Sequence, residues 1–163
     1  MHTIGITGSA GFLGWHTRCL LATHNDIRVI NADRSIFDCP ESIRNFVSEC
    51  DAIIHLAGIN RADDETILRE NPRLAEVIIQ AMEDTSHTPH VLHSSSTHID
   101  ANTPYACSKR TVGELFDEWA GRANGTFTDV VLPNLFGECG KPFYNSVVST
   151  FCHQLASNET PNI

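Results

Sequence analysis

Tyr105 and Lys109 are the residues whose types and spacing most directly suggest chemistry in this sequence. They stand four positions apart in PYACSK, so on a helix their side chains would lie on one face. A tyrosine hydroxyl, with an ordinary pKa of about 10, is a poor acid–base catalyst near neutral pH. A lysine ammonium one turn away favours the phenolate and lowers that pKa. The pair therefore predicts proton donation to the oxygen of a ketone as it is reduced.

Three consecutive serines, Ser94, Ser95 and Ser96, precede this pair at the end of an apolar segment that is typical of a strand. A serine hydroxyl can orient a carbonyl group and stabilise the charge that develops on it. Neighbouring residues of a strand face opposite sides of the sheet, so the three hydroxyls do not all reach one ligand. The residues alone leave open which serine acts.

A second motif, GSAGFLG, lies between a predicted strand and a predicted helix near the start of the chain. In dinucleotide-binding folds the first glycine permits a tight turn, the second lets a pyrophosphate approach the backbone, and the third lets the helix pack on the strand. The helix N-terminus then offers unpaired N–H groups to phosphate. We therefore expect a dinucleotide to bind at the motif, through Gly8, Gly11, Phe12, Leu13 and Gly14. The spacing, G-x-x-G-x-x-G, departs from the more common G-x-G-x-x-G.

Asp33 and Arg34 end the next predicted strand and favour different dinucleotides. A carboxylate at this place accepts hydrogen bonds from the adenosine ribose of NAD and repels a 2′-phosphate. A guanidinium is well suited to bind that same phosphate in NADP. Farther along, the segment AIIHLAG ends in Leu56, Ala57 and Gly58, of which the last two are small enough to leave space for a ribose or nicotinamide.

The order of elements predicts an α/β fold, a Rossmann-like doubly wound parallel sheet in a three-layer α/β/α arrangement. The expected strands are residues 2–7, 27–32, 52–57, 91–95 and 128–132, and the expected helices are 12 to about 23, 40–49, 65–82, 104–120 and 144–156. Pro72 is expected to disturb the third helix. The short interval between Asp33 and Asp51 leaves little room for a complete βα unit, so one strand is expected to be missing or vestigial. Residues 1–163 are expected to be one domain, truncated before the C-terminal substrate-binding part.

The composition excludes several classes of protein. A net charge of −9 argues against nucleic acid and anionic membrane surfaces as partners. The sequence has no apolar run long enough to span a membrane and no export signal, so we expect a cytoplasmic protein. Its six cysteines and nine histidines are dispersed without metal-ligand spacing, which favours reduced thiols and no metal site.

The segments GSAGFLG, HLAG, SSS, PYACSK and PNLFGE, in this order, resemble the extended short-chain dehydrogenase/reductases. That resemblance covers essentially the whole chain. It implies that Ser96 is the catalytic serine, acting with Tyr105 and Lys109. It also assigns further cofactor and substrate contacts. Ser94, Pro133 and Asn71, which opens a helix behind the active site, would lie on the cofactor side, and Asn134 would contact substrate.

The closing stretch, residues 131–159, together with HLAGINR, is similar to the bacterial capsular-polysaccharide nucleotide-sugar reductases, which join an N-terminal reductase to a C-terminal cupin. The resemblance implies reduction of the C4 ketone of a UDP-linked 6-deoxy-amino-sugar by a homodimeric enzyme. It also makes Arg34 the cation for the 2′-phosphate, so NADP(H) is favoured over NAD(H). The expected substrate contacts then include Arg61, Ser95, Lys141, Tyr144 and Asn145.

Other functions stay open at this point. A nucleotide-sugar 4-epimerase or dehydratase would share the same fold. A dehydratase would favour an Asp-Glu pair beside the active serine, where this sequence has Thr97 and His98. A non-catalytic NAD(P)-binding module would have no need of the set Ser96, Tyr105 and Lys109. A structural dimer module would use the helices expected at 104–120 and 144–156.

Overall fold

The computed structural model of the chain describes residues 1–161. They fall into two compact units that divide after Val131. The first unit holds the strands β1 (His2–Thr7), β2 (Ile27–Ala32), β3 (Ala52–His55), β4 (His90–Ser96) and most of β5 (Phe127–Leu132), with the helices α1 (Phe12–Leu21), α2 (Pro40–Glu49), α3 (Asp64–Thr85) and α4 (Pro104–Ala123). A 3-10 helix, η1 (Arg34–Asp38), follows β2, and the second unit contains α5 (Val147–Ala156).

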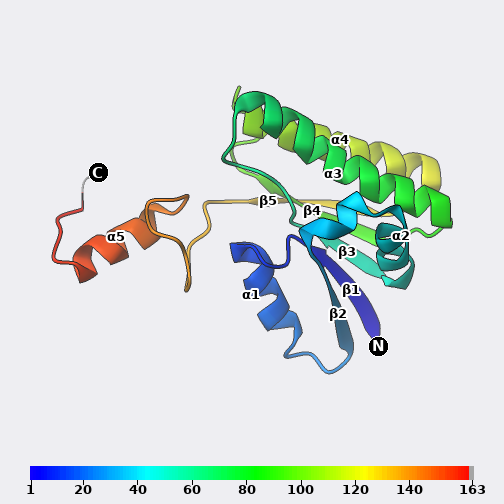
Figure 1. Cartoon of the computed structure of the whole chain (residues 1–163), viewed down its shortest axis with the longest axis horizontal. Coiled ribbons are helices and arrows are strands. Elements are labelled where there is room, and N and C mark those ends of the chain that lie inside the picture. The colour runs from blue at the N-terminus through cyan, green and yellow to red at the C-terminus, as the bar shows by residue number, and fades with distance from the viewer. Residues whose placement is uncertain (162–163) are drawn as a thin grey trace. The chain divides into compact units, whose positions relative to one another are not determined.

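The five strands form one parallel sheet in the order β2-β1-β3-β4-β5. The chain moves outward from β1 to β2 and then returns past β1 to β3, β4 and β5. Right-handed crossovers place the helix of the first step on one face of the sheet and those of the later steps on the other. Figure 1 accordingly shows α1 on the opposite side of the sheet from α3 and α4. The predicted Rossmann-like three-layer fold is confirmed.

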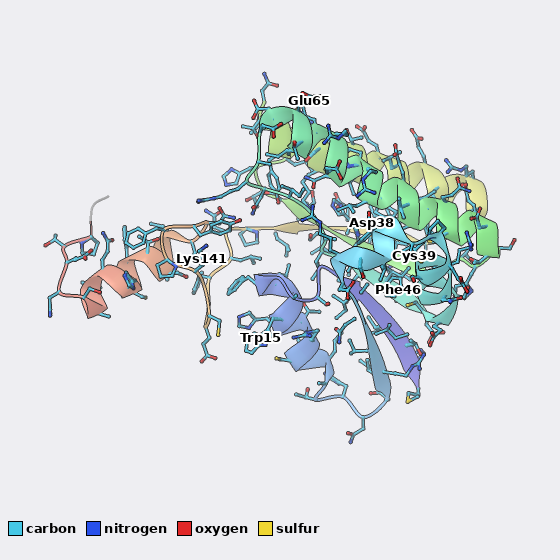
Figure 2. All side chains as sticks on the ribbon, in the orientation of Figure 1. Trp15, Asp38, Cys39, Phe46, Glu65 and Lys141 are labelled. Atoms are coloured by element: carbon cyan, nitrogen blue, oxygen red, sulfur yellow. The ribbon has the colours of Figure 1, made fainter. Side chains whose placement is uncertain are left out.

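The main core lies between the sheet and the helices α2, α3 and α4. Phe116 and Trp119 of α4 are fully buried in this core, and other fully buried members of the cluster include Ile53, Val47, Ile78 and Val91. Phe46, labelled in Figure 2, packs on β1 where Gly5 has no side chain, since a Cβ at Gly5 would lie 2.5 Å from its ring. This face of the sheet is therefore held rigidly by side-chain packing.

The connection from β2 to β3 is abbreviated, as the sequence predicts. It contains only η1 and α2, and in the described part of the chain β2 is an edge strand. The strand that would extend the sheet beyond β2 is missing from these residues. The carboxyl end of β2, which carries Asp33, is consequently open to solvent on its outer side.

The predicted disturbance at Pro72 is wrong, because α3 runs without interruption from Asp64 to Thr85. Proline removes one backbone hydrogen bond from a helix. Here the helix retains a long buried face that includes Leu74, Ile78 and Met82. It ends three residues later than expected, where Ser86 adopts a left-handed conformation with φ of 50°.

Other boundaries shift by a few residues. Strand β3 ends at His55, so the small residues after it form a loop rather than the end of a strand. Helix α5 begins at Val147, where the Ser146 side chain accepts a hydrogen bond from the backbone N–H of Ser149. None of the helices in residues 1–161 is long and apolar enough to cross a membrane. The expectation of a single domain over residues 1–163 stays a prediction.

Candidate active site

The turn between β1 and α1 has the geometry that its glycines predict. Gly8 has a φ of +68°, and a Cβ there would lie 2.7 Å from the backbone nitrogen of Ala57. A Cβ at Gly14 would meet the carbonyl oxygen of Gly8 and lie 2.7 Å from the Cα of Ser9. Both positions therefore accept glycine alone, because a side chain would collide with backbone.

Gly11 differs from these two glycines because, apart from one backbone oxygen, the space around it is open. A Cβ at Gly11 would have one near neighbour among the described residues, the Gly8 carbonyl oxygen at 3.2 Å. The Gly11 N–H donates to this same oxygen at 2.9 Å, and the Gly11 carbonyl accepts from the N–H of Trp15. The three intervening N–H groups, of Phe12, Leu13 and Gly14, have no acceptors within the helix.

No acidic residue lies in the first turn of α1 to occupy its positive end. The open side of Gly11 and the unpaired N–H groups together fit a pyrophosphate. The residues of this turn are therefore suited to hold a dinucleotide.

Asp33 and Arg34 lie together at the carboxyl end of β2. The Asp33 carboxylate caps η1 by accepting hydrogen bonds from the N–H and the hydroxyl of Ser35, at 2.9 and 2.5 Å. These hydrogen bonds hold the pKa of Asp33 below its usual value. Arg34 is exposed and has no ion pair with any described residue. One carboxylate oxygen of Asp33 thus serves local structure, whereas the guanidinium of Arg34 is available.

The loop after β3 is tied to the end of β1. The Thr7 hydroxyl hydrogen-bonds His55 Nδ1 at 2.9 Å and accepts from the N–H of Ala57 at 3.2 Å. The Thr7 carbonyl accepts from the N–H of Leu56 at 3.2 Å. These bonds hold Leu56 and Ala57 directly against Gly8, so two of the predicted cofactor segments are neighbours.

Asn71 joins the β3 loop to α4. Its Oδ1 accepts from the N–H of Ile59 at 2.7 Å, and its Nδ2 donates to the Ile59 carbonyl at 3.0 Å and to Ser108 Oγ at 2.9 Å. Ser108 Oγ in turn donates to the carbonyl oxygen of Tyr105 at 2.8 Å. Both Nδ2 hydrogens of this 2%-exposed residue are thus used within the protein. The expectation that Asn71 opens a helix is wrong, because α3 begins at Asp64 and Asn71 lies within it. The structure gives Asn71 a positioning role, and its direct contact with a cofactor stays a prediction.

Tyr105 and Lys109 lie in the first turns of α4, which Thr103 caps by accepting from the N–H of Ala106. Tyr105 is half-buried, whereas Lys109 is only 6% exposed. Lys109 Nζ donates to the carbonyl oxygen of Ser94 at 2.7 Å and lies 5.9 Å from the centre of the Tyr105 ring. Burial lowers the pKa of Lys109 to about 8. The lysine is therefore fixed between the end of β4 and the tyrosine.

The prediction that Lys109 lowers the pKa of Tyr105 is wrong for this structure. Burial raises the pKa of the Tyr105 hydroxyl. The lysine ammonium lies beside the aromatic ring and is bonded to Ser94 rather than to the phenol oxygen. Loss of water around the phenolate is thus the larger effect on Tyr105.

The three serines at the end of β4 have different surroundings. Ser94 provides the carbonyl that receives Lys109. Ser95 Oγ is buried near the Asp129 carboxylate, but its geometry falls short of a full hydrogen bond with any described group. Ser96 is half-buried, and its Oγ accepts from the N–H of His98 at 3.2 Å. The assignment of Ser96 as the catalytic serine stays a prediction.

Two residues that the sequence analysis did not select also reach Lys109. His93 Nε2 lies 3.3 Å from Lys109 Nζ, and His93 Nδ1 lies 2.8 Å from Asp129 Oδ1. The side chain of His93 is completely buried, and that of Asp129 is 32% exposed. A histidine directly before the three serines was the available signal in the sequence.

The remaining predicted cofactor and substrate residues are one residue of the first unit and a group of residues in the second unit. Arg61 is exposed in the segment before α3. Pro133, Asn134, Lys141, Tyr144 and Asn145 belong to the second unit, in which Lys141 Nζ lies 5.2 Å from the Tyr144 ring centre. Their roles stay predictions. Among residues 1–161, no group of three His, Cys, Asp or Glu side chains is placed to hold a metal ion.

A comparison with known protein families agrees with this arrangement of the Gly8 turn, the loop after β3 and helix α4. The model of the NAD dependent epimerase/dehydratase family matches residues 4–163. The chain belongs to this family. An NAD-dependent family agrees with a turn after β1 that is suited to hold a dinucleotide.

Individual relatives agree with this assignment. UDP-2-acetamido-2,6-beta-L-arabino-hexul-4-ose reductase from Pseudomonas aeruginosa is 32% identical over 153 residues, which cover 92% of this chain and 40% of the relative. The crystal structure of capsular polysaccharide assembling protein CapF from Staphylococcus aureus has a TM-score of 0.76 at 30% identity, over 99% of this chain and 42% of CapF. The chain therefore spans less than half the length of these two relatives.

RMD from Pseudomonas aeruginosa, solved in complex with NADPH, has a TM-score of 0.86 at 22% identity, over 97% of this chain and 62% of RMD. At this level of identity the likeness supports the fold alone. It agrees with the sheet order and with the layers described above.

Proposed function

We propose that this chain is the cofactor-binding and catalytic part of a nucleotide-sugar reductase, which uses NADPH to reduce the C4 ketone of a UDP-linked 4-keto-6-deoxy-amino-sugar. The name of the Pseudomonas aeruginosa relative, a reductase of a UDP-linked hexulose, supports the substrate class. The family supports a nicotinamide dinucleotide as cofactor. The homodimer and the cytoplasmic location expected from the sequence belong to the same proposal.

The placement of Lys109 is the observation that carries the proposal. A buried lysine is costly unless its charge has partners. Here the side chain is fixed by Ser94 beside Tyr105, at the edge of the sheet where the Gly8 turn also lies. A module that only binds a dinucleotide has no need of such an arrangement.

The side chains have complementary tasks in the proposed reaction. NADPH, when bound at the Gly8 turn, would supply the hydride. Because burial raises its pKa, Tyr105 holds its proton at neutral pH and is suited to donate it to the oxygen of the reduced carbonyl. The Ser96 hydroxyl is proposed to orient that carbonyl. Lys109 stabilises the tyrosinate that remains after the proton has moved.

NADPH is proposed over NADH because Arg34 is free to bind a 2′-phosphate. A charge-assisted hydrogen bond between a guanidinium and a phosphate contributes about 1.5–3 kcal/mol, or roughly 10–100-fold in affinity. Fluorescence titration should therefore show tighter binding of NADPH than of NADH. In Arg34→Ala the NADPH affinity should fall by this factor, with little change for NADH. Tighter binding of NADH would overturn the preference, and binding of neither would remove the cofactor assignment.

The catalytic assignment is tested by turnover of a UDP-linked 4-keto-6-deoxy sugar with NADPH. Tyr105→Phe removes only the hydroxyl, so turnover should fall by at least about a hundredfold while NADPH binding is retained. Unchanged turnover in this variant would exclude Tyr105 as the proton donor. Thr111→Val, which removes an exposed hydroxyl from the same helix α4, is the control and should leave turnover unchanged.

A further inference from the structure

Lys109 is linked through His93 to a carboxylate on another strand. Its Nζ is 3.3 Å from His93 Nε2, and His93 Nδ1 is 2.8 Å from Asp129 Oδ1. The three side chains come from α4, β4 and β5, so tertiary structure alone brings them together. We refer to them as the Lys109–His93–Asp129 chain.

The hydrogen-bonding chemistry of Lys109 and Asp129 determines which tautomer His93 adopts. A lysine ammonium can only donate hydrogen bonds, so Nε2 of a neutral His93 must accept from Lys109. The ring proton then lies on Nδ1 and is donated to the Asp129 carboxylate. Burial lowers the pKa of His93 to about 2, which agrees with a neutral ring between the two charges.

We propose that His93 and Asp129 are positioning residues that hold Lys109 in its ammonium form beside Tyr105. The Asp129 carboxylate holds His93 as the Nδ1–H tautomer and acts through it as the counter-ion of the buried lysine. The Ser94 carbonyl fixes the place of Nζ. The consequence for catalysis rests on the proposed function, whereas the charge state of Lys109 does not.

The other titratable groups that face Lys109 leave Asp129 as its charged partner. His55 of β3 lies with its ring centre 6.0 Å from that of His93, and burial lowers the pKa of His55 to about 3. Tyr105 on α4 is half-buried and has a raised pKa. Both are neutral at pH 7. Asp129 is therefore the one anion among these three groups.

The chain contains only two lysines, Lys109 and Lys141, which permits a direct test. In protein labelled with ¹³C at lysine Cε, each lysine gives one NMR signal, and Lys141→Arg assigns them. Titration from pH 6 to 11 should give Lys109 a midpoint about 8, below the ordinary value of 10.5. Asp129→Asn keeps an oxygen to accept from His93 but removes the charge. Its Lys109 midpoint should fall by about one pH unit.

Two further variants sharpen the result. His93→Gln offers Lys109 an amide oxygen but breaks the link to Asp129, so its midpoint should also fall. Asp117→Asn removes an exposed carboxylate eight residues farther along α4 and should change the midpoint by less than about 0.2 units, since it lies more than a Debye length away. Equal midpoints in Asp129→Asn and Asp117→Asn would overturn the proposal.

A second measurement uses the unmodified protein and tests the proposal even if a variant fails to fold. Long-range ¹H–¹⁵N spectra distinguish the two tautomers of His93. The Nδ1–H tautomer at pH 7 is the expected result, and an Nε2–H tautomer or an imidazolium would contradict the proposal. Neither experiment requires cofactor or substrate, so a failure of the proposed function to appear in turnover assays leaves this test intact.

Discussion

Two helices, α1 and α4, begin near the same edge of the sheet and build their parts of the candidate site in opposite ways. The start of α1 is made of backbone, with Gly8 and Gly14 admitting no side chain and Gly11 facing open space. The first turns of α4 are made of buried side chains, with Lys109 bonded to Ser94 and His93. The start of α1 therefore depends on the absence of side-chain atoms, and the first turns of α4 depend on charge and protonation. Different substitutions and conditions should therefore disrupt the two regions.

Gly8→Ala should have the largest effect on stability. The new Cβ would lie 2.7 Å from Ala57 N on a backbone with φ of +68°. The left-handed conformation and the backbone overlap together should lower the free energy of unfolding by about 4 kcal/mol. Urea denaturation measures this change. Gly121→Ala on α4 is the control, because a Cβ there would meet no atom of residues 1–161 within 4 Å beyond its own helix backbone, and it should be neutral or stabilising.

Asn71→Ala should lower the free energy of unfolding by about 3 kcal/mol. It removes three hydrogen bonds from a buried place and leaves the N–H and carbonyl of Ile59 without partners. If Asn71 positions α4, turnover should fall more than this loss of stability explains. Asn45→Ala, at an exposed place on α2, is the matched control. A change as small as that of the control would show that Asn71 does not hold the loop after β3 to α4.

Acidification should destabilise the α4 region by about 2 kcal/mol per buried histidine between pH 7.5 and pH 5. The folded-state pKa of His55 is about 3 and that of His93 about 2, below the ordinary value near 6.5. The unfolded chain therefore binds more protons, and stability is lost as the pH falls below 6.5. Urea midpoints at pH 5, 6 and 7.5 measure the loss. In His55→Gln the loss of stability on acidification should be smaller by about 2 kcal/mol. In His24→Gln, an exposed control, the loss should equal that of the wild type. A flat pH profile in the wild type would contradict the prediction.

Gly11→Ala should have the smallest effect on stability, less than about 1 kcal/mol, because its Cβ would have only the Gly8 oxygen within 4 Å among the described residues. The new methyl would instead occupy the space proposed for a pyrophosphate. We expect NADPH affinity to fall by about tenfold or more, or about 1.4 kcal/mol. Fluorescence titration beside urea denaturation separates the two effects. Unchanged affinity would show that the open side of Gly11 faces no ligand.

The α1 region could be predicted from the sequence because the turn between β1 and α1 requires glycine for local steric reasons. Gly8 and Gly14 each exclude a Cβ, and their spacing around a strand end is visible in the chain. The strands were predictable for a similar reason, since buried parallel strands are short apolar runs. The predicted disturbance at Pro72 was wrong because the packing of the buried face of α3 outweighs the local preference of proline against a helix interior.

The α4 region could be predicted only in part. The spacing of Tyr105 and Lys109 is local, but the direction in which the Tyr105 pKa shifts depends on burial that the sequence does not show. His93 and Asp129 are 36 residues apart and meet only because β4 and β5 are neighbours. Pairings of this kind require the tertiary fold.

The turn at Gly8 is braced from two sides before any ligand is present. Ala57 and Leu56 lie against it, and its own hydrogen bond to Gly11 closes it. A ligand that binds there has no loop to order, so association costs little conformational entropy. Recognition at this turn should resemble docking to a rigid surface, with fast association and with affinity differences expressed mainly in the rate of dissociation.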